Sequence, residues 1–570
     1  MPQPDLVIRN GKIADGTGAP LFEGDVAITG GRIAGIGRID AAGREEIDAT
    51  GKLVTPGFVD IHTHYDGQAV WDDRLAPSSV HGVTTAVMGN CGVGFAPVRP
   101  TDHLKLIELM EGVEDIPGAA LHEGLDFRWE SFDDYLGVLE RRPRDIDLCA
   151  QLPHGPLRVY VMGERAVRRE EATADDVAAM RVLTAEAISA GALGFTTTRS
   201  LNHRTATGDY TPTLRAAAEE LKGIALGLKD ANAGVLQVIS DFDTPSLEVE
   251  FAMLRELVEI SGRPLSISVA QRHTQPGHWR EIMALVDQAV DDGLPMRAQV
   301  APRPIGVLLG LQSSRNPFSF TPAYAEIQDL PLAERVARMR EPAFRARLLD
   351  EIEAPQRGYK KRVTEWPLIF PFGDPPDYSP PAEMRISAIA EREGRAPGAV
   401  ALDLMLQNEG RGFIYAPFAN YADHNLDVCR EMLTRPNTLP GLSDGGAHVR
   451  LISDGSFPTY MLSHWGRDRT TGRLDIPWLI KRQTADTAAA VSLNDRGRLA
   501  PGLKADVNVI DMDRLALHAP LMASDLPAGG SRLLQGADGY VATICSGQVI
   551  YREGQATGAL PGKLVRGPQV

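Results

Sequence analysis

The sequence predicts an α/β fold, a TIM-like (β/α)8 barrel joined to a small β-sandwich that both chain termini build. Through the middle of the chain, short continuous apolar runs alternate with helical patterns, as in buried parallel strands connected by helices. At both ends, short strand-like segments follow one another. A parallel centre enclosed by such ends indicates one barrel and one separate β domain.

The terminal segments predict the β-sandwich. Near the N-terminus, two pairs of strand-like segments each enclose a two-residue turn, Asn10-Gly11 in the first pair and Gly30-Gly31 in the second. Such turns supply the positive φ angles that a tight hairpin needs. The same texture returns between residues 506 and 554. We therefore expect residues 1–56 and 500–570 to form one β-sandwich.

The central apolar runs predict the barrel, which we expect to span residues 57–499. Nine candidate strands compete for eight barrel positions, and we expect residues 412–417 to lie outside the barrel. The candidates are 54–62, 83–89, 147–152, 191–197, 234–240, 264–270, 295–301, 412–417 and 439–445.

Residues 302–400 interrupt this alternation. They include a charged helical stretch at 331–353 and the proline-rich run PFGDPPDYSPPAE at 371–383. A long segment of this kind inside a domain is usually a functional lid or an inserted subdomain. We therefore expect an insertion or lid at 302–400 within the barrel.

Composition restricts the classes of partner. The chain has 570 residues, of which 43% are apolar, and 59 Lys and Arg against 75 Asp and Glu give a net charge of −16. That apolar fraction is sufficient for a core and excludes extensive disorder. The acidic balance argues against nucleic acid and anionic membranes as partners. We expect a small-molecule substrate, and leave open whether the chain forms a homo-oligomer.

The cysteines indicate the compartment. Cys91, Cys149, Cys429 and Cys545 lie far apart and form no C-x-x-C pair, which is typical of a reducing environment. The N-terminal residues show no basic region followed by an apolar one, and no run of 18 apolar residues occurs. We therefore expect a cytoplasmic protein without a membrane span.

The strongest local motif is Asp60-Ile61-His62-Thr63-His64, at the end of an apolar run. His62 and His64 share one face of an extended chain, because successive side chains point to opposite sides. Two imidazoles at the C-terminal end of a barrel strand can bind one divalent ion, and catalytic groups lie at that end. Two solvated histidines after a core strand are the alternative.

A second motif, Ser443-Asp444-Gly445-Gly446, follows the last candidate strand. Asp444 could ligate a metal, accept a proton from water and deliver it to a leaving amine. The two glycines would let the backbone approach a ligand closely. An Asx turn that leads into a helix is the alternative.

These motifs and three others give the chain a resemblance to a known family. The segments that show the resemblance are VTPGFVDIHTH, HGVTTAVMGNCGVGFAPVRP, GALGF, SDGG and RGRLAPGLKADVNVID. They resemble the amidohydrolase superfamily, and within it the D-aminoacylase branch of N-acyl-D-amino-acid deacylases. The resemblance runs from about residue 5 to 200 and from about 437 to 565. It implies a (β/α)8 barrel with a β-sandwich from both termini, in agreement with the strand pattern.

The resemblance implies roles for four residues. His62 and His64 match the metal-ligating histidines of the first barrel strand. Asp444 matches the last-strand aspartate, which is both a metal ligand and the general acid/base. Cys91 matches the thiolate that this branch uses as a ligand, although a buried apolar thiol is the alternative. Imidazole and thiolate both suit Zn²⁺.

The chain departs from the family at the fifth and sixth strands, where the family has a histidine near each strand end. The segments here are GVLQVISD (234–241) and PLSISVAQRH (264–273), with Val, Ile and Ala at the positions where imidazoles are expected. Three outcomes follow, in order of preference: a single-ion site on the first-strand histidines and Asp444, a reorganised site that uses Cys91, or loss of the metal. We expect one divalent ion, Zn²⁺, per chain.

Five further residues could contact substrate at the ends of barrel strands. An arginine there can pair with a carboxylate through two parallel hydrogen bonds, although surface ion pairing is the commoner role of a loop arginine. The candidates are Arg199 and His203 after the fourth strand, Arg272 and His273 after the sixth, and His448 after the eighth.

The sequence therefore suggests a metal-dependent amidohydrolase. The hypothesis is hydrolysis of the amide C–N bond in an N-acyl amino acid, of D configuration, by activated water with Asp444 as general acid/base. The rebuilt fifth and sixth strands motivate an alternative substrate, a cyclic amide, carbamate or xenobiotic amide. An alternative of another class is a non-catalytic scaffold with an amidohydrolase-like barrel.

Overall fold

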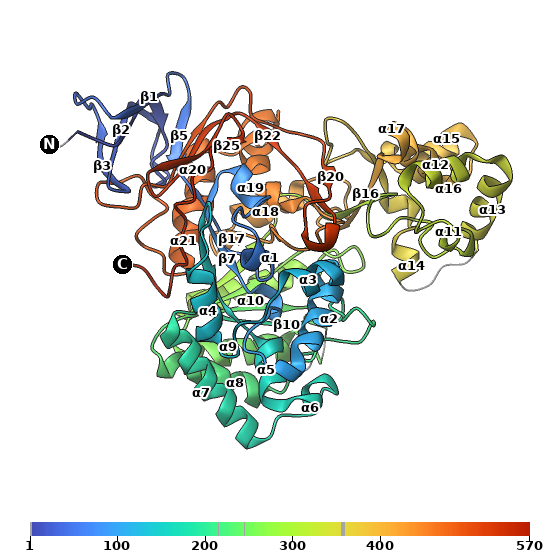
Figure 1. Cartoon of the computed structure of the whole chain (residues 1–570), viewed down its shortest axis with the longest axis horizontal. Coiled ribbons are helices and arrows are strands. Elements are labelled where there is room, and N and C mark those ends of the chain that lie inside the picture. The colour runs from blue at the N-terminus through green and yellow to red at the C-terminus, as the bar shows by residue number, and fades with distance from the viewer. Residues whose placement is uncertain (1–2, 215, 244, 355–358) are drawn as a thin grey trace.

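A computed structural model describes residues 3–214, 216–243, 245–354 and 359–570 (Figure 1). The predicted fold class is confirmed: eight parallel strand positions form a barrel, and strands from both chain ends form a β domain. The exact boundaries 1–56, 57–499, 302–400 and 500–570 remain predictions.

The β domain contains a sheet whose described strands come from both termini. β5 (Leu53–Pro56) pairs antiparallel with β18 (Val507–Ile510), with Val54 opposite Val509, and this pairing joins the two ends. Val54 and Val509 belong to a separate apolar core. The remaining strands are β1 (Leu6–Ile13), β2 (Phe22–Thr29), β3 (Arg32–Gly37), β4 (Glu45–Asp48), β23 (Tyr540–Cys545), β24 (Gln548–Arg552) and β25 (Gln555–Ala556).

The barrel strands follow the predicted order along the chain. They are β6 (Phe58–Asp60), β7 (Val83–Met88), β8 (Asp147–Ala150) with β9 (Leu152–Pro153), β10 (Gly194–Arg199), β11 (Val235–Ser240), β12 (Leu265–Ser268), β13 (Met296–Val300) and β17 (Thr438–Pro440). β8 and β9 share the third position, because β8 pairs with β7 and β9 pairs with β10. A parallel bridge between Thr63 and Gly445 closes the ring beyond β17 and β6.

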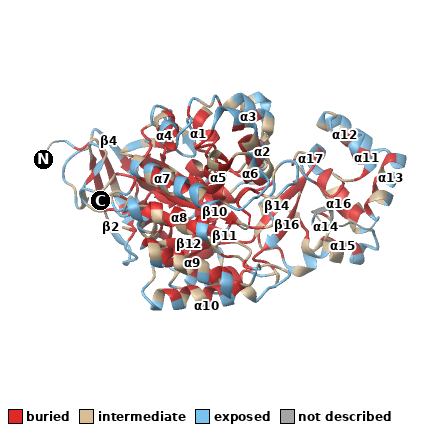
Figure 2. Cartoon of the chain, turned by 90° about the horizontal axis from the view of Figure 1, so that it is seen from below, coloured by how far each residue is buried: buried red, intermediate tan, exposed pale blue. Residues whose placement is uncertain are grey.

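Amphipathic helices cover the outside of the barrel. In α10 (His278–Asp291), Trp279, Ile282, Met283 and Val286 are buried, and their spacing puts them on one face. α7 (Ala174–Ala190) begins with a capping box in which Thr173 and Asp176 satisfy each other's backbone N–H groups. Figure 2 shows the resulting layers, with buried strands inside and helices whose outer faces are exposed. The other covering helices include α4 (Phe132–Glu140), α5 (His154–Met162), α8 (Ala218–Asp230), α9 (Leu247–Ser261) and α18 (Asp427–Thr434).

A second apolar core lies in the segment that interrupts the barrel, at the right of Figure 1. There β16 (Phe413–Ala419) pairs antiparallel with β14 (Ile305–Gly310) and β15 (Phe370–Phe372), so residues 412–417 lie outside the barrel, as expected. Its helices are α11 (Pro322–Ala325), α12 (Leu332–Arg340), α13 (Pro342–Ile352), α14 (Tyr359–Arg362), α15 (Ile386–Glu393), α16 (Pro397–Met405) and α17 (Gln407–Gly410).

The buried guanidinium of Arg303 ties this segment to the barrel. It stacks on the ring of Tyr378 and pairs with Asp454 at 3.0 Å. Across the described residues, no helix is long and apolar enough to cross a membrane.

Candidate metal centre at the barrel mouth

The first barrel strand delivers two imidazoles to one point. His62 and His64 follow β6 and both turn inward, whereas Ile61, just before His62, enters the apolar core. Each imidazole is only 1% exposed, and the ring centroids are 5.6 Å apart. The predicted shared face is therefore present.

A tight turn after β7 brings a thiol to the same point. Cys91 is buried and has a left-handed φ of 55°. A Cβ on the next residue, Gly92, would lie 2.9 Å from Cα of Thr197, so the turn needs glycine to pack against the fourth strand. Gly89, on the other side, has the same constraint against Gln151. The glycines of this motif thus let the thiol face inward.

The segment after β17 completes the ring and carries Asp444. The N–H of Asp444 donates to the carbonyl of His62 at 3.2 Å, and the N–H of His64 donates to the carbonyl of Gly445 at 2.7 Å. Asp444 has a φ of 48° and Leu442 a φ of 61°, and such conformations cost about 1–3 kcal/mol each. The strained backbone is held by these bonds at the point where Asp444 meets the two imidazoles.

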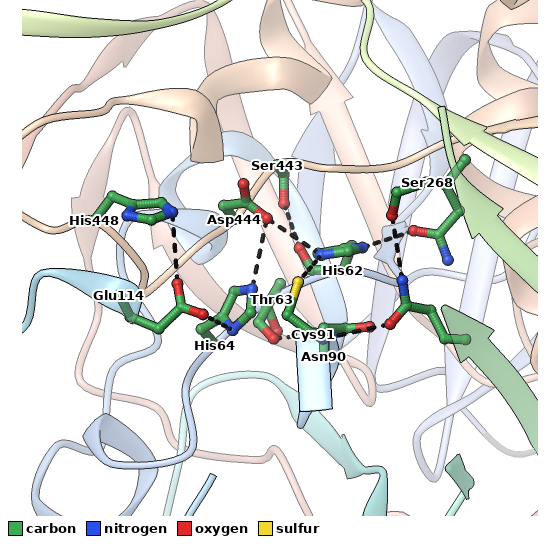
Figure 3. Close-up of polar contacts among 12 residues, drawn as sticks. His62, Thr63, His64, Asn90, Cys91, Glu114, Ser268, Ser443, Asp444 and His448 are labelled. Atoms are coloured by element: carbon green, nitrogen blue, oxygen red, sulfur yellow. Dashed lines mark hydrogen bonds and ion pairs between the residues drawn. The ribbon is translucent and has the colours of Figure 1, made fainter. Parts of the chain in front are cut away.

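Four possible ligand groups converge at the mouth (Figure 3). One ligand atom from each of His62, His64 and Cys91 lies within 4.8 Å of the others. Oδ1 of Asp444 lies 3.4 Å from Nε2 of His62 and 3.6 Å from Nε2 of His64. Two imidazole nitrogens, one sulfur and one carboxylate oxygen form a donor set that Zn²⁺ accepts. The residues present therefore fit a divalent metal.

Further side chains orient these groups from outside. Nδ1 of His62 lies 2.7 Å from Oε1 of Gln299, and Nδ1 of His64 lies 3.3 Å from a carboxylate oxygen of Glu114. Both contacts leave Nε2 facing the centre, as in metal sites where the second ring nitrogen binds a carboxylate or carbonyl.

The charges of the four groups depend on one another. Burial lowers the pKa of His62, partly opposed by Asp444. Burial also disfavours the charged form of His64, but the carboxylates of Glu114 and Asp444 outweigh it and raise the pKa of His64. At Asp444, burial is outweighed by the two imidazoles, which lower the pKa of its carboxyl. Burial raises the pKa of the Cys91 thiol to about 11, so a bound cation would be needed to favour the thiolate.

The fifth to seventh strands present amides and hydroxyls to the mouth. Oε1 of Gln237 accepts from the N–H of Cys91 at 3.4 Å, and its Nε2 donates to Ser268 at 3.2 Å. Nε2 of Gln299 donates to Ser266 at 2.9 Å. Sequence reasoning did not single out these polar side chains, and which residues stand at the positions of the family's imidazoles stays a prediction. Val238 and Val269 belong to the apolar core, because alternate residues of each strand face opposite sides.

Of the five predicted substrate-contacting residues, two lie close to the centre. Nε2 of His448 is 3.6 Å from Glu114. Nδ1 of His203 is 2.9 Å from Oγ1 of Thr198. Burial lowers the pKa of His203 to about 3, with smaller contributions from His448 and His64, so its imidazole is neutral.

Of the other three predicted residues, the two arginines are paired elsewhere. Arg199 pairs with Glu250 at 2.5 Å, and Arg272 forms two bonds of 2.7 and 2.8 Å to Asp243. Burial lowers the pKa of His273, with His424 acting in the same direction. The structure does not bring these three side chains to the centre, and substrate contact by them stays a prediction.

Sequence reasoning missed Glu114, Gln237 and Gln299. A signal exists for Glu114. It occupies the apolar face of a helix over residues 103–114, with buried Ile107 and Met110 seven and four residues earlier. A carboxylate on such a face needs a partner. The glutamines carry no such signal, because which strand face points inward depends on the barrel itself.

Comparisons with known proteins agree with this architecture. The family model described as Amidohydrolase family matches residues 45–551. D-aminoacylase of Alcaligenes xylosoxydans xylosoxydans is 32% identical over 293 residues, which cover 50% of this chain and 55% of that protein. N-acyl-D-glutamate deacylase of the same organism is 28% identical, and the alignment covers 91% of both chains.

A solved structure has the same fold. It is N-acyl-D-glutamate deacylase from Bordetella bronchiseptica, complexed with zinc and a phosphonate inhibitor that mimics the tetrahedral intermediate of the reaction. The TM-score is 0.65 at 24% sequence identity, and the match covers 99% of this chain and 100% of that chain.

Proposed function

Because this chain belongs to the amidohydrolase family, we propose that it is a metal-dependent hydrolase of the amide C–N bond in N-acyl amino acids, with preference for the D configuration. The observation that carries the proposal is the convergence of His62, His64, Cys91 and Asp444 at the C-terminal ends of barrel strands, where such folds place their chemistry. The names of the full-length and partial relatives support the substrate class.

These four residues would hold one divalent ion, and their donor types favour Zn²⁺. The inclusion of Cys91 in the cluster favours a reorganised site over one formed by the histidines and Asp444 alone. When bound, such an ion polarises a carbonyl and acidifies water. Gln299 and Glu114 hold the imidazoles with Nε2 toward the centre.

Asp444 carries the proton. Its side chain is 18% exposed, the most accessible of the four, and it is ionised because the imidazoles lower the pKa of its carboxyl. It accepts a proton from water at the mouth, and the oxygen of that water attacks the acyl carbon. When the C–N bond breaks, Asp444 returns the proton to the leaving nitrogen, which yields a carboxylic acid and an amine that then ionise in water.

His203 and His448 face the substrate side in this proposal. Oγ1 of Thr198 accepts from the N–H of Ser200 at 3.3 Å, and its own proton can go to Nδ1 of His203. The proton of the neutral His203 ring then lies on Nε2, where it can donate to substrate oxygen. We place His448 beside it as a second polar contact.

A substrate panel tests the proposal. Purified, zinc-loaded protein is given N-acyl-D-amino acids, their L counterparts and cyclic amides, and amine release is measured. We expect hydrolysis of the D series above the L series. Turnover of cyclic amides alone would support the alternative substrate class. The amide and hydroxyl groups on the fifth and sixth strands motivate that alternative.

Elemental analysis separates both enzyme hypotheses from a non-catalytic scaffold. After growth in zinc-replete medium, we expect close to one metal ion per chain. A content below about 0.1 per chain would contradict the metal site. We further propose a cytoplasmic location, supported by the four free, buried cysteines.

A further inference from the structure

One buried carboxylate contacts two imidazoles from different parts of the barrel mouth. Glu114 is the last residue of α2 (His103–Glu114) and is 1% exposed. Its Oε1 lies 3.3 Å from Nδ1 of His64, and its Oε2 lies 3.6 Å from Nε2 of His448 (Figure 3). His64 follows the first strand and His448 follows the eighth, so Glu114 contacts the segments that follow both of these strands.

The imidazole of His64 needs this carboxylate. Its Nδ1 is buried and, within the described residues, has no hydrogen bond of good geometry. A buried ring nitrogen without a partner is costly, and Oε1 of Glu114 at 3.3 Å is placed to receive its proton. The carboxylate in turn requires cationic or N–H partners, because an unpaired buried charge is destabilising.

The position of Glu114 is fixed by the packing of α2. Gly112, two residues earlier, approaches the backbone of Thr205 so closely that a side chain would collide with it. The carbonyl of Glu108 also accepts from the N–H of Ala206 at 3.0 Å. These contacts fasten α2 to the loop that carries His203.

The residue that follows α2 adds a third anchor. The carboxylate of Asp115 accepts a hydrogen bond of 2.6 Å from Ser314, which follows β14 in the inserted segment. The end of α2 therefore contacts three regions around the mouth: the loop after the fourth strand, the inserted segment, and the imidazoles at the first and eighth strands.

We propose that Glu114 is a positioning residue that holds His64 and His448 at the same time. It fixes His64 with Nε2 toward Cys91 and Asp444, and it holds His448 at the mouth for contact with substrate. This inference rests on the proposed function, because it treats His64 as a metal ligand.

The decisive variant is Glu114→Gln, which keeps the size of the side chain but leaves one acceptor oxygen in place of two. Glu108→Gln is the matched control, because Glu108 lies on the same helix with an exposed side chain. Affinity is measured with Co²⁺ alone, by competition with a chelator and by the absorption spectrum of the bound ion. We expect Glu114→Gln to bind Co²⁺ about 10- to 100-fold more weakly than wild type, and Glu108→Gln to be unchanged.

Failure of the proposed function and failure of the positioning role give different results. If wild type binds no Co²⁺, the proposed function fails; if wild type and Glu114→Gln bind it equally with the same spectrum, the positioning role fails. If Glu114→Gln does not fold, Glu114→Asp decides. That variant keeps the charge but is too short to reach both imidazoles, so we expect weaker Co²⁺ binding and a changed spectrum. Unchanged binding and spectrum in Glu114→Asp would overturn the inference.

A double-mutant cycle tests the contact with His448. On the best substrate of the panel, Glu114→Gln is compared in wild type and in a His448→Gln background, with saturating metal. If Glu114 acts through His448, its effect on kcat/KM shrinks at least about threefold in that background. An undiminished effect would show that Glu114 does not hold His448.

Discussion

The two halves of the barrel mouth carry different chemistry. The half formed by β6, β7 and β17 presents two imidazoles, a thiol and a carboxylate within a few ångströms of one another. The half formed by β11, β12 and β13 presents Gln237, Ser266, Ser268 and Gln299, which bond to one another or to the first half. The first half offers strong ligands for a divalent ion, and the second offers only neutral hydrogen-bonding groups.

The two halves therefore differ in how strongly they could bind a metal ion. Amides and hydroxyls are weak ligands for Zn²⁺ compared with imidazole and thiolate. They satisfy each other and the backbone N–H of Cys91, so the inner faces of the fifth and sixth strands remain polar and bonded. Gln299 contacts His62 and Gln237 contacts the backbone of Cys91, so the second half supports possible ligand groups of the first half.

The largest expected effect comes from removal of the carboxylate of the first half. Asp444→Asn keeps the shape of the side chain but cannot accept and return a proton. We expect kcat to fall by about 10²- to 10⁴-fold with the fold intact, measured by turnover and by circular dichroism. Asp209→Asn, in an exposed loop, is the control. Substantial turnover by Asp444→Asn would refute its role as general acid/base.

The next effect concerns the thiol of the first half, Cys91. In Cys91→Ser, a weak hydroxyl ligand replaces the thiolate, so we expect metal affinity to fall by at least about tenfold in a chelator competition. Cys429→Ala, which removes a buried thiol elsewhere, should retain wild-type affinity. If Cys91→Ser binds metal like wild type, the ion is held by the histidines and Asp444 alone.

Imidazoles introduced into the second half should let it bind a metal ion. The double substitution Gln237→His and Ser268→His places imidazoles in the second half, one at the residue that contacts Cys91 and one at its neighbour. We expect the metal content to rise from about one toward two ions per chain, measured by elemental analysis of the folded protein. An unchanged content in a folded variant would mean that more than these two side chains separates the halves.

The smallest effect is expected outside both halves. Arg272 is engaged by Asp243 through two hydrogen bonds, so Arg272→Gln should change KM by less than about twofold. Steady-state kinetics on the best substrate provides the measurement. A KM at least tenfold higher would instead support the sequence-based role of Arg272 in binding a substrate carboxylate.

Much of the first half could be predicted because its signals are local. His62 and His64 are two residues apart on one strand, and that spacing alone puts them on the same side. The glycines around Cys91 and after Asp444 mark turns that approach neighbouring strands, and the family resemblance suggests the roles proposed for both residues. The strand pattern likewise predicted the barrel and excluded residues 412–417 from it.

The fold class, the strand ends and the kinds of group that they carry can therefore be predicted from the order of residues alone. Which residues of the fifth and sixth strands face inward depends on the closed barrel, because alternation along a strand defines two faces but does not say which one points inward. The tertiary structure also brings Glu114 to His64 and His448. These three residues are far apart in the chain, and their contact depends on how α2 packs against the mouth.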